Sequence, residues 1–161
     1  MIYRFCFLAV FVFLSSCKNE VLFSKYKSLP MVWHKDSVVK FNFQINKNSS
    51  RYNTYINLRV NDKYLFNNIF LIVDLQNSKN ERIIDTLEYT MANIEGKLIG
   101  KELIGITENK LIHKEDLSLI EDLEYEIRIR HAMRVINKTE GIDLLEGILD
   151  VGYSIEEIKK E

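Results

Sequence analysis

Two kinds of residue in this chain could take part in covalent or acid–base chemistry, the two cysteines and the three histidines. The thiol of Cys17 ends the sequence Leu14-Ser15-Ser16-Cys17, which fits the lipobox of bacterial lipoproteins. In that motif the thiol is the nucleophile that takes a diacylglycerol group, and a lipoprotein signal peptidase cuts the chain just before it. We therefore expect the mature protein to begin at a lipid-modified Cys17.

The segment before Cys17 has the layout of a secretory signal. Arg4 is followed by an apolar run from Phe5 to Leu14 and then by the small residues Ser15 and Ser16. Ten residues of helix reach about 15 Å, half of a hydrocarbon core of roughly 30 Å, so this run is too short to span a bilayer. We predict a lipoprotein signal peptide at residues 1–16. An ordinary secretory signal and a buried N-terminal strand with an incidental cysteine are the alternatives.

The remaining cysteine and the histidines do not have metal-site spacing. His34, His113 and His131 each lack a second histidine three to five residues away. Cys6 lies in the predicted signal peptide and Cys17 would be alkylated, which leaves no disulfide framework and no cysteine-based metal site. His131 falls on the apolar face of an alternating segment, where we expect a hydrogen-bonded core histidine. We expect neither a metal ion nor a cofactor.

Other signs of catalysis are also weak. The chain has no glycine-rich phosphate loop and no Gly-x-Ser-x-Gly elbow. Glu124 and Glu126 alternate outward beside Arg128 and Arg130, which favours a charge ladder on a sheet over a pair of glycosidase carboxylates. Without Arg4 the 22 basic residues become 21 against 23 acidic ones, a net charge of −2. We therefore expect no enzyme activity, no small-molecule substrate and no nucleic-acid partner.

The elements that would position these residues have the period of β-strands. In Val39–Asn46 every odd position is apolar, and Tyr52–Asn61 has the same alternation with Ile56, Leu58 and Val60 inward. A polar, turn-forming loop separates the two segments, so we predict that they form an antiparallel hairpin. Asn68–Leu75 is almost continuously apolar, which predicts a central strand covered on both faces.

Further strands are predicted at Glu81–Met91, Lys97–Ile99, Glu124–Met133 and Leu149–Ile158. The segment Ile104–Leu119 has no clear period, and residues 115–123 read as a helical turn or a loop. About seven or eight short strands without amphipathic helices predict an all-β fold, an antiparallel β-sandwich. The mature 145 residues suit one domain. We expect a lipidated tether at residues 17–35 and the sandwich domain at residues 36–161.

Polar residues interrupt the alternation at three places. Asp85-Thr86 breaks a predicted strand, Asp150 precedes Val151-Gly152, and Arg134 follows a strand end. In one interpretation these residues cap strand ends and turns through hydrogen bonds to the backbone. In the other, Arg134 docks onto Asp150 or Asp85 and pins the last two strands together, or the residues form a rim used by a partner protein.

The ordered series of such residues resembles the GldH family, gliding-motility lipoproteins of the Bacteroidetes. The resemblance extends from Trp33 to Glu156, and the chain departs from the usual residues of the family at Leu65 and at Tyr153-Ser154. The matching residues are Trp33, Lys35-Asp36, Phe41, Phe43, Leu58-Arg59, Asn61, Tyr64, Phe66, Asn68, Asp85-Thr86, Gly96, Gly100, Met133-Arg134, Gly147-Ile148 and Asp150-Val151-Gly152.

The resemblance implies a non-enzymatic lipoprotein of the cell envelope that is needed for gliding motility, a process linked to the type IX secretion system. It implies a membrane anchor through the lipid, in the outer membrane or at the periplasmic face, and contacts with other envelope or gliding proteins. Lys18-Asn19-Glu20 also resembles a signal for export to the cell surface. The candidate residues for structural or partner contacts are Arg59, Asn61, Tyr64, Asn68, Asp85, Thr86, Arg134, Asp150 and Gly152.

Two other classes remain as alternatives. A surface carbohydrate-binding module would need an exposed aromatic platform, for which Tyr55, Tyr64 and Phe70 are the candidates. An envelope hydrolase would need a convergent nucleophile or metal set, and the sequence does not indicate one.

Overall fold

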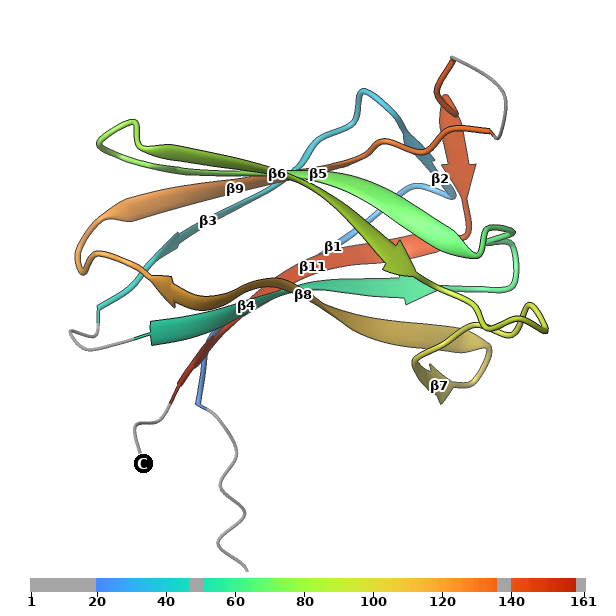
Figure 1. Cartoon of the computed structure of the whole chain (residues 1–161), viewed down its shortest axis with the longest axis horizontal. Coiled ribbons are helices and arrows are strands. Elements are labelled where there is room, and N and C mark those ends of the chain that lie inside the picture. Colours follow the sequence, from blue (N-terminus) through green and yellow to red (C-terminus); the bar gives the residue numbers. More distant parts are fainter. Residues whose placement is uncertain (1–19, 47–50, 136–139, 159–161) are drawn as a thin grey trace, which may run out of the picture.

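The computed structural model describes residues 20–46, 51–135 and 140–158 of the chain. All regular structure in these ranges is β-strand, arranged in antiparallel sheets of five, four and two strands (Figure 1). In chain order the strands are β1 (Val21–Ser28), β2 (Val32–His34), β3 (Val39–Gln44), β4 (Arg51–Val60), β5 (Asn68–Asn77), β6 (Arg82–Thr90), β7 (Lys101–Leu103), β8 (Ile106–Ser118), β9 (Glu124–His131), β10 (Leu144–Glu146) and β11 (Ile148–Glu157).

The two larger sheets form the layers of a β-sandwich, as predicted. The five-stranded sheet has the order β1-β11-β4-β8-β7, and the four-stranded sheet has the order β3-β9-β5-β6 (Figure 1). β2 and β10 pair with each other beside them. A ring contact joins the layers, since the ring centroid of Phe43 of β3 lies 6.1 Å from that of Tyr153 of β11.

Period-two alternation gives each layer one apolar face. Val39, Phe41 and Phe43 of β3 are buried while the residues between them are exposed, and Ile127 and Ile129 of β9 are fully buried. Burying one such side chain stabilises the fold by roughly 1.5–3 kcal/mol. The predicted inward residues of β4, β9 and β11 are all buried, so the core lies between the sheets where the alternation placed it.

The predicted hairpin of Val39–Asn46 with Tyr52–Asn61 is wrong. β3 pairs with β9 in the four-stranded sheet, whereas β4 lies between β11 and β8 in the five-stranded sheet. A polar loop indicates that the chain turns, but it does not indicate whether the next strand stays in the same sheet. In a sandwich, consecutive strands often belong to opposite layers.

The predicted tether is also wrong over most of its length, because β1 and β2 lie within it. β1 pairs with β11 from Val21 opposite Glu156 to Ser28 opposite Asp150. Trp33 of β2 is fully buried, and its indole nitrogen donates a hydrogen bond of 2.9 Å to the carbonyl oxygen of Ser37. An edge strand such as β1 keeps most of its side chains in solvent, so its sequence has no apolar period to detect.

The segment without a clear period, Ile104–Leu119, contains the longest strand of the described chain, β8. Its pairing with β4 shifts register on both sides of Thr54, so β8 carries extra residues there, and Asp116 has a positive φ of 53°. Such bulges move the alternation from one face to the other. The bulged pattern resembles a loop or a helical turn in the sequence, which explains why the prediction is wrong for residues 115–118 at the end of β8. Residues 119–123 form a loop, as predicted.

The other strand predictions are mostly confirmed. β5, β6, β9 and β11 lie at the predicted places, and β5 is an inner strand, although its outward residues Phe70 and Ile72 are only half buried. β6 continues through Asp85-Thr86 without a break. Lys97–Ile99 is not a strand but contributes a bridge between Ala92 and Leu98, and the edge strand β7 follows it.

A shortened chain tests whether β1 and β2 belong to the domain. A chain that starts at Glu20 should unfold cooperatively, as the full domain does. A chain that starts at Asp36, the boundary predicted from the sequence, should lose that cooperativity because β11 loses a paired neighbour and the core loses Trp33. Thermal unfolding followed by circular dichroism checks this, and equal transitions for the two chains would contradict the assignment.

Candidate functional site

Two of the predicted residues, Arg59 and Asp150, meet Glu108 on the outer face of the five-stranded sheet. Arg59 of β4 lies between Asp150 of β11 and Glu108 of β8 in the strand register. Its Nε donates a hydrogen bond of 3.1 Å to Glu108, and its Nη1 lies 3.6 Å from Asp150. Opposite charges on neighbouring strands stabilise a sheet by roughly 0.2–1 kcal/mol per pair, so this row joins three strands.

Tyr26 of β1 extends the row to the edge of the sheet. The guanidinium of Arg59 lies 4.3 Å from the centroid of the Tyr26 ring, and the Tyr26 hydroxyl donates a hydrogen bond of 2.9 Å to Glu108. Burial, together with the hydrogen bond to Glu108, raises the pKa of Tyr26 to about 12. The ring lies against Gly152, where a Cβ atom would be only 2.7 Å from a ring carbon. Gly152 thus provides the space in which Tyr26 covers β11.

A second group lies in the connection between β4 and β5. Asn61 caps this turn, because its side-chain oxygen accepts a hydrogen bond of 3.1 Å from the backbone nitrogen of Lys63. The hydroxyl of Tyr64 donates to the carbonyl oxygen of Asn68 at 2.6 Å, and burial strongly raises the pKa of Tyr64. Asn68 in turn donates to Glu88. These residues therefore hold a turn in place, which is the capping interpretation.

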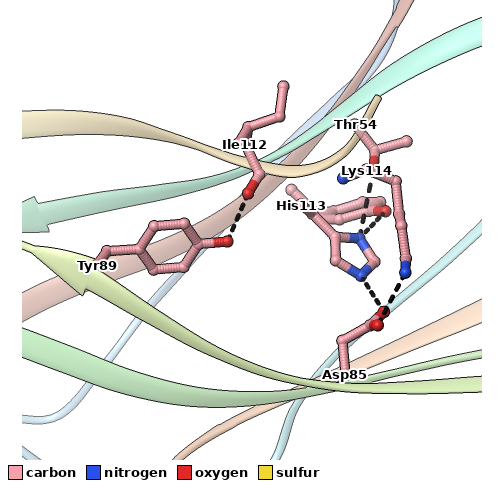
Figure 2. Close-up of polar contacts among 7 residues, drawn as sticks. Thr54, Asp85, Tyr89, Ile112, His113 and Lys114 are labelled. Atoms are coloured by element: carbon pink, nitrogen blue, oxygen red, sulfur yellow. Dashed lines mark hydrogen bonds and ion pairs between the residues drawn. The ribbon is translucent and has the colours of Figure 1, made fainter. Parts of the chain in front are cut away.

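A third group connects the two sheets through Asp85 of β6 (Figure 2). One carboxylate oxygen of Asp85 lies 3.2 Å from Nε2 of His113, and the other accepts a hydrogen bond of 2.8 Å from Lys114. On the far side of the ring, Nδ1 of His113 lies 2.9 Å from the hydroxyl of Tyr153 and 3.3 Å from that of Thr54. His113 lies at the bulge of β8, which directs its ring into the sandwich.

The carboxylate, imidazole and hydroxyl of this group are arranged like the parts of a nucleophilic triad. Burial lowers the pKa of His113, although the hydrogen bond and the charge of Asp85 oppose this effect. Burial also raises the pKa of Tyr153. Thr54 and Tyr153 have no exposed surface, so a substrate cannot reach either hydroxyl. The arrangement therefore pairs buried polar groups across the layers rather than presenting a reactive one.

Arg134 and Thr86 do not join any of these groups. Arg134 is exposed just after β9, where its backbone forms a bridge to Gly141. The predicted docking of Arg134 onto Asp150 or Asp85 is wrong, because Asp150 pairs with Arg59, and Asp85 pairs with His113 and Lys114. Thr86 is exposed on the outer face of β6. Opposite charge alone could not show which carboxylate each cation would reach.

The aromatic platform expected for a carbohydrate-binding module is not formed. Tyr55 lies on the outer face of β4, where Nζ of Lys110 is 4.0 Å from its ring centroid. Tyr64 is buried in the connection after β4, and Phe70 belongs to the other sheet. The three rings therefore do not share a face.

Two predictions about single residues have different outcomes. His131 is a buried core histidine, as expected, with Nε2 lying 3.0 Å from the carbonyl oxygen of Trp33. Cys17 lies outside the described residues.

Within the described ranges, the acidic, histidine and cysteine side chains do not gather into groups of three or more that could ligate a metal ion. The same ranges contain no helix with the length and hydropathy needed to cross a membrane.

Sequence reasoning missed Tyr26, Glu108 and His113. Tyr26 lay in the segment assigned to the tether, and the other two lay in the segment without a period. The only available signal was the charge and size of these side chains, because both parent strands lack clean alternation.

The extent of the fold matches one known family. The model of the GldH lipoprotein family covers residues 21–155, from the first residue of β1 into β11. The chain belongs to the GldH lipoprotein family. Because the match starts at Val21, the GldH unit includes β1 and β2, as the strand pairing does.

Two GldH relatives align over nearly their whole length. The chain is 42% identical to the gliding motility lipoprotein GldH of Flavobacterium johnsoniae over 146 residues, 91% of each chain. It is 36% identical to a gliding motility lipoprotein GldH homolog of Christiangramia forsetii over 152 residues, 94% of this chain and 93% of the relative. No solved structure shows a significant match.

Replacing Gly152 tests the contact with Tyr26. Gly152→Ala should destabilise the domain by about 1–3 kcal/mol, because the added methyl group overlaps the ring of Tyr26. Tyr26→Ser removes the ring, so the double variant should be more stable than the sum of the two single effects predicts. Urea unfolding of the four proteins measures this coupling, and simple additivity would contradict the contact.

The burial of His113 and His131 predicts a dependence of stability on pH. Burial lowers both pKa values below that of an unfolded histidine, about 6.5. Below that pH the unfolded chain takes up protons that the folded chain excludes, so the free energy of unfolding should fall as the pH is lowered from 7 toward 5. Each histidine contributes a slope of at most about 1.4 kcal/mol per pH unit.

The variant His113→Gln should reduce this slope, whatever its effect on stability at pH 7. His34→Gln is the matched control, since the side chain of His34 is half exposed. The carboxyl group of Asp74 titrates below the interval from pH 5 to 7, because the hydrogen bond from Arg82 lowers its pKa. Urea unfolding at each pH gives the slopes, and an unchanged slope for His113→Gln would show that this histidine takes up its proton at the same pH in the folded and the unfolded chain.

Proposed function

We propose that this chain is a membrane-anchored lipoprotein that supports gliding motility and the type IX secretion machinery associated with it, through contacts with other envelope proteins. Membership of the GldH family over residues 21–155 carries the proposal. The names of both relatives state gliding motility and lipoprotein. The assignment to secretion and to protein contacts goes beyond these names.

The polar groups of the domain favour a binding role over catalysis. The charges around Arg59 are paired on the sheet, and the imidazole of His113 has partners on both nitrogen atoms inside the sandwich. Both arrangements stabilise strand pairing and layer packing. What the molecule offers to its surroundings is therefore its shape and its exposed side chains, held on a rigid frame.

The lipid on Cys17 would hold this frame close to a membrane. Only residues 18–20 separate Cys17 from the first residue of β1. Four residue steps extend to about 14 Å at most, which is less than half the thickness of a bilayer core. This connecting segment is far shorter than the tether of residues 17–35 expected from the sequence. The end of the sandwich at which β1 starts therefore faces the membrane.

Replacing the lipidated residue tests the anchor. Cys17→Ala should abolish incorporation of radiolabelled palmitate and release the protein from the membrane fraction, while the domain keeps its β-sheet circular dichroism spectrum. Cys6→Ala, in the predicted signal peptide, is the matched control and should change neither result. A Cys17→Ala protein that remains in the membrane fraction as fully as the parent would exclude lipid anchoring at this residue.

Deleting the gene in its own host tests the assignment to motility and secretion. The deletion should reduce colony spreading where the host glides and should reduce the amount of type IX cargo in the medium. The full chain supplied in trans should restore both. Normal spreading and normal cargo secretion after deletion would refute the proposed function.

A further inference from the structure

Five large apolar side chains are exposed at one end of the sandwich, and we call them the apolar tips. Ile94 and Ile104 are almost completely exposed, at 105% and 95%, and Leu65 is 83% exposed. Apolar side chains gathered in one exposed place mark a contact surface more often than scattered ones do. The apolar tips are Leu65 after β4, Ile94 and Ile99 between β6 and β7, and Leu103 and Ile104 in the β7–β8 hairpin.

The three segments that carry the apolar tips surround one hollow of about 440 Å³. Leu65 itself lines the hollow, and Lys97 and Glu102 line it from the other two segments. The polar lining has both signs of charge, since Asp62 and Glu102 face the same space as Lys97. Phe66 and Leu98 add apolar side chains to this lining, so the hollow can take up an apolar segment.

The backbone at Ile104 is strained. Ile104 and Gly105 form the two-residue turn of the β7–β8 hairpin, and their φ angles are 46° and 74°. Two positive φ values define a type I′ turn, for which Asn-Gly is a favoured sequence, whereas a β-branched residue at positive φ is a rare outlier. The exposed side chain of Ile104 recovers none of this cost by burial, so fold stability does not explain its presence. Strain of this kind often accompanies function.

The apolar tips lie at the opposite end of the sheet from the membrane anchor. Val21, where β1 begins, is opposite Glu156 near the end of β11, while Ile148 at the start of β11 is opposite Val60. Val60 pairs with Thr107, beside the strained turn (Figure 1). A ten-residue strand is about 33 Å long, and the lipid on Cys17 can extend only about 14 Å from Val21. A sandwich that stands on its anchored end therefore holds the apolar tips about one strand length away from the bilayer.

We propose that the apolar tips and the hollow between them are the docking site for another envelope protein, which inserts a protruding apolar segment into the hollow. A flat bilayer surface does not fill a concave site, and the chain's own N-terminal segment emerges at the other end. The inference rests on the proposed function, because it names the surface through which the anchored domain makes its protein contact.

Photo-crosslinking in living cells tests the docking site. The full-length lipoprotein with p-benzoylphenylalanine at position 94 should form one discrete adduct with a different protein. Adding Ile104→Asn should abolish the adduct, while the folded protein becomes at least as resistant to urea, because Asn-Gly suits the turn. Ile120→Asn is the matched control: it removes an exposed isoleucine from the connection between β8 and β9, at the anchored end, and should leave the adduct intact.

Each other outcome overturns the proposal. Adducts only with lipid would assign the apolar tips to a membrane, and adducts with the same polypeptide would assign them to self-association. An adduct that persists with Ile104→Asn, or no adduct at all, would also refute the docking site.

Complementation separates this inference from the proposed function. In a host in which deletion impairs spreading or secretion, the double variant Ile94→Asn with Ile104→Asn should restore less than a tenth of the parental activity at equal protein level. Full restoration by the double variant would refute the docking site and leave the proposed function standing. Absence of any deletion phenotype would refute the proposed function itself.

Discussion

The pairing of β1 with β11 is the constraint on which the rest of the structure depends. β11 hydrogen-bonds to β1 on one side and to β4 on the other, so the C-terminal strand is an inner strand and the N-terminal strand closes its edge. Tyr26 and Arg59 fasten this edge from outside, and the absence of a side chain at Gly152 lets them do so. With the lipid anchor proposed at Cys17, which is only four residues before Val21, the same pairing would decide which end of the sandwich faces the membrane.

The two layers are held together in different ways along the sandwich. Aromatic rings fill the space near β3 and β11, whereas Asp85 and Lys114 reach across the layers beside the buried imidazole of His113. Apolar contacts tolerate small sliding movements, but hydrogen bonds between buried groups require one relative position of the sheets. The bulge in β8 is what turns His113 inward, so an irregular strand supplies the most specific contact between the layers.

The fold class and most of the core could be predicted from alternation alone. β3, β4, β9 and β11 each bury one face, and such strands declare both their existence and their inward residues. Sheet membership could not be predicted, because strand period contains no information about partners, and this produced the wrong hairpin. β1 and β8 were missed because an edge position and a bulge each erase the period. Among the candidate residues, Arg59, Asp150 and Gly152 do meet, but Arg134 does not join them, since distances across a sheet depend on the pairing that the pattern leaves open.

The position of β11 has a consequence for how the protein is made. The strand that occupies an inner place in the five-stranded sheet leaves the ribosome after the ten other described strands. Until it emerges, β1 and β4 have no strand to lie between them, and the contacts that close the sheet join residues more than a hundred positions apart. Formation of such distant contacts is slow. The five-stranded sheet of the growing polypeptide therefore stays incomplete until β11 has been translated, and an incompletely folded chain is the kind that a translocation channel can accept.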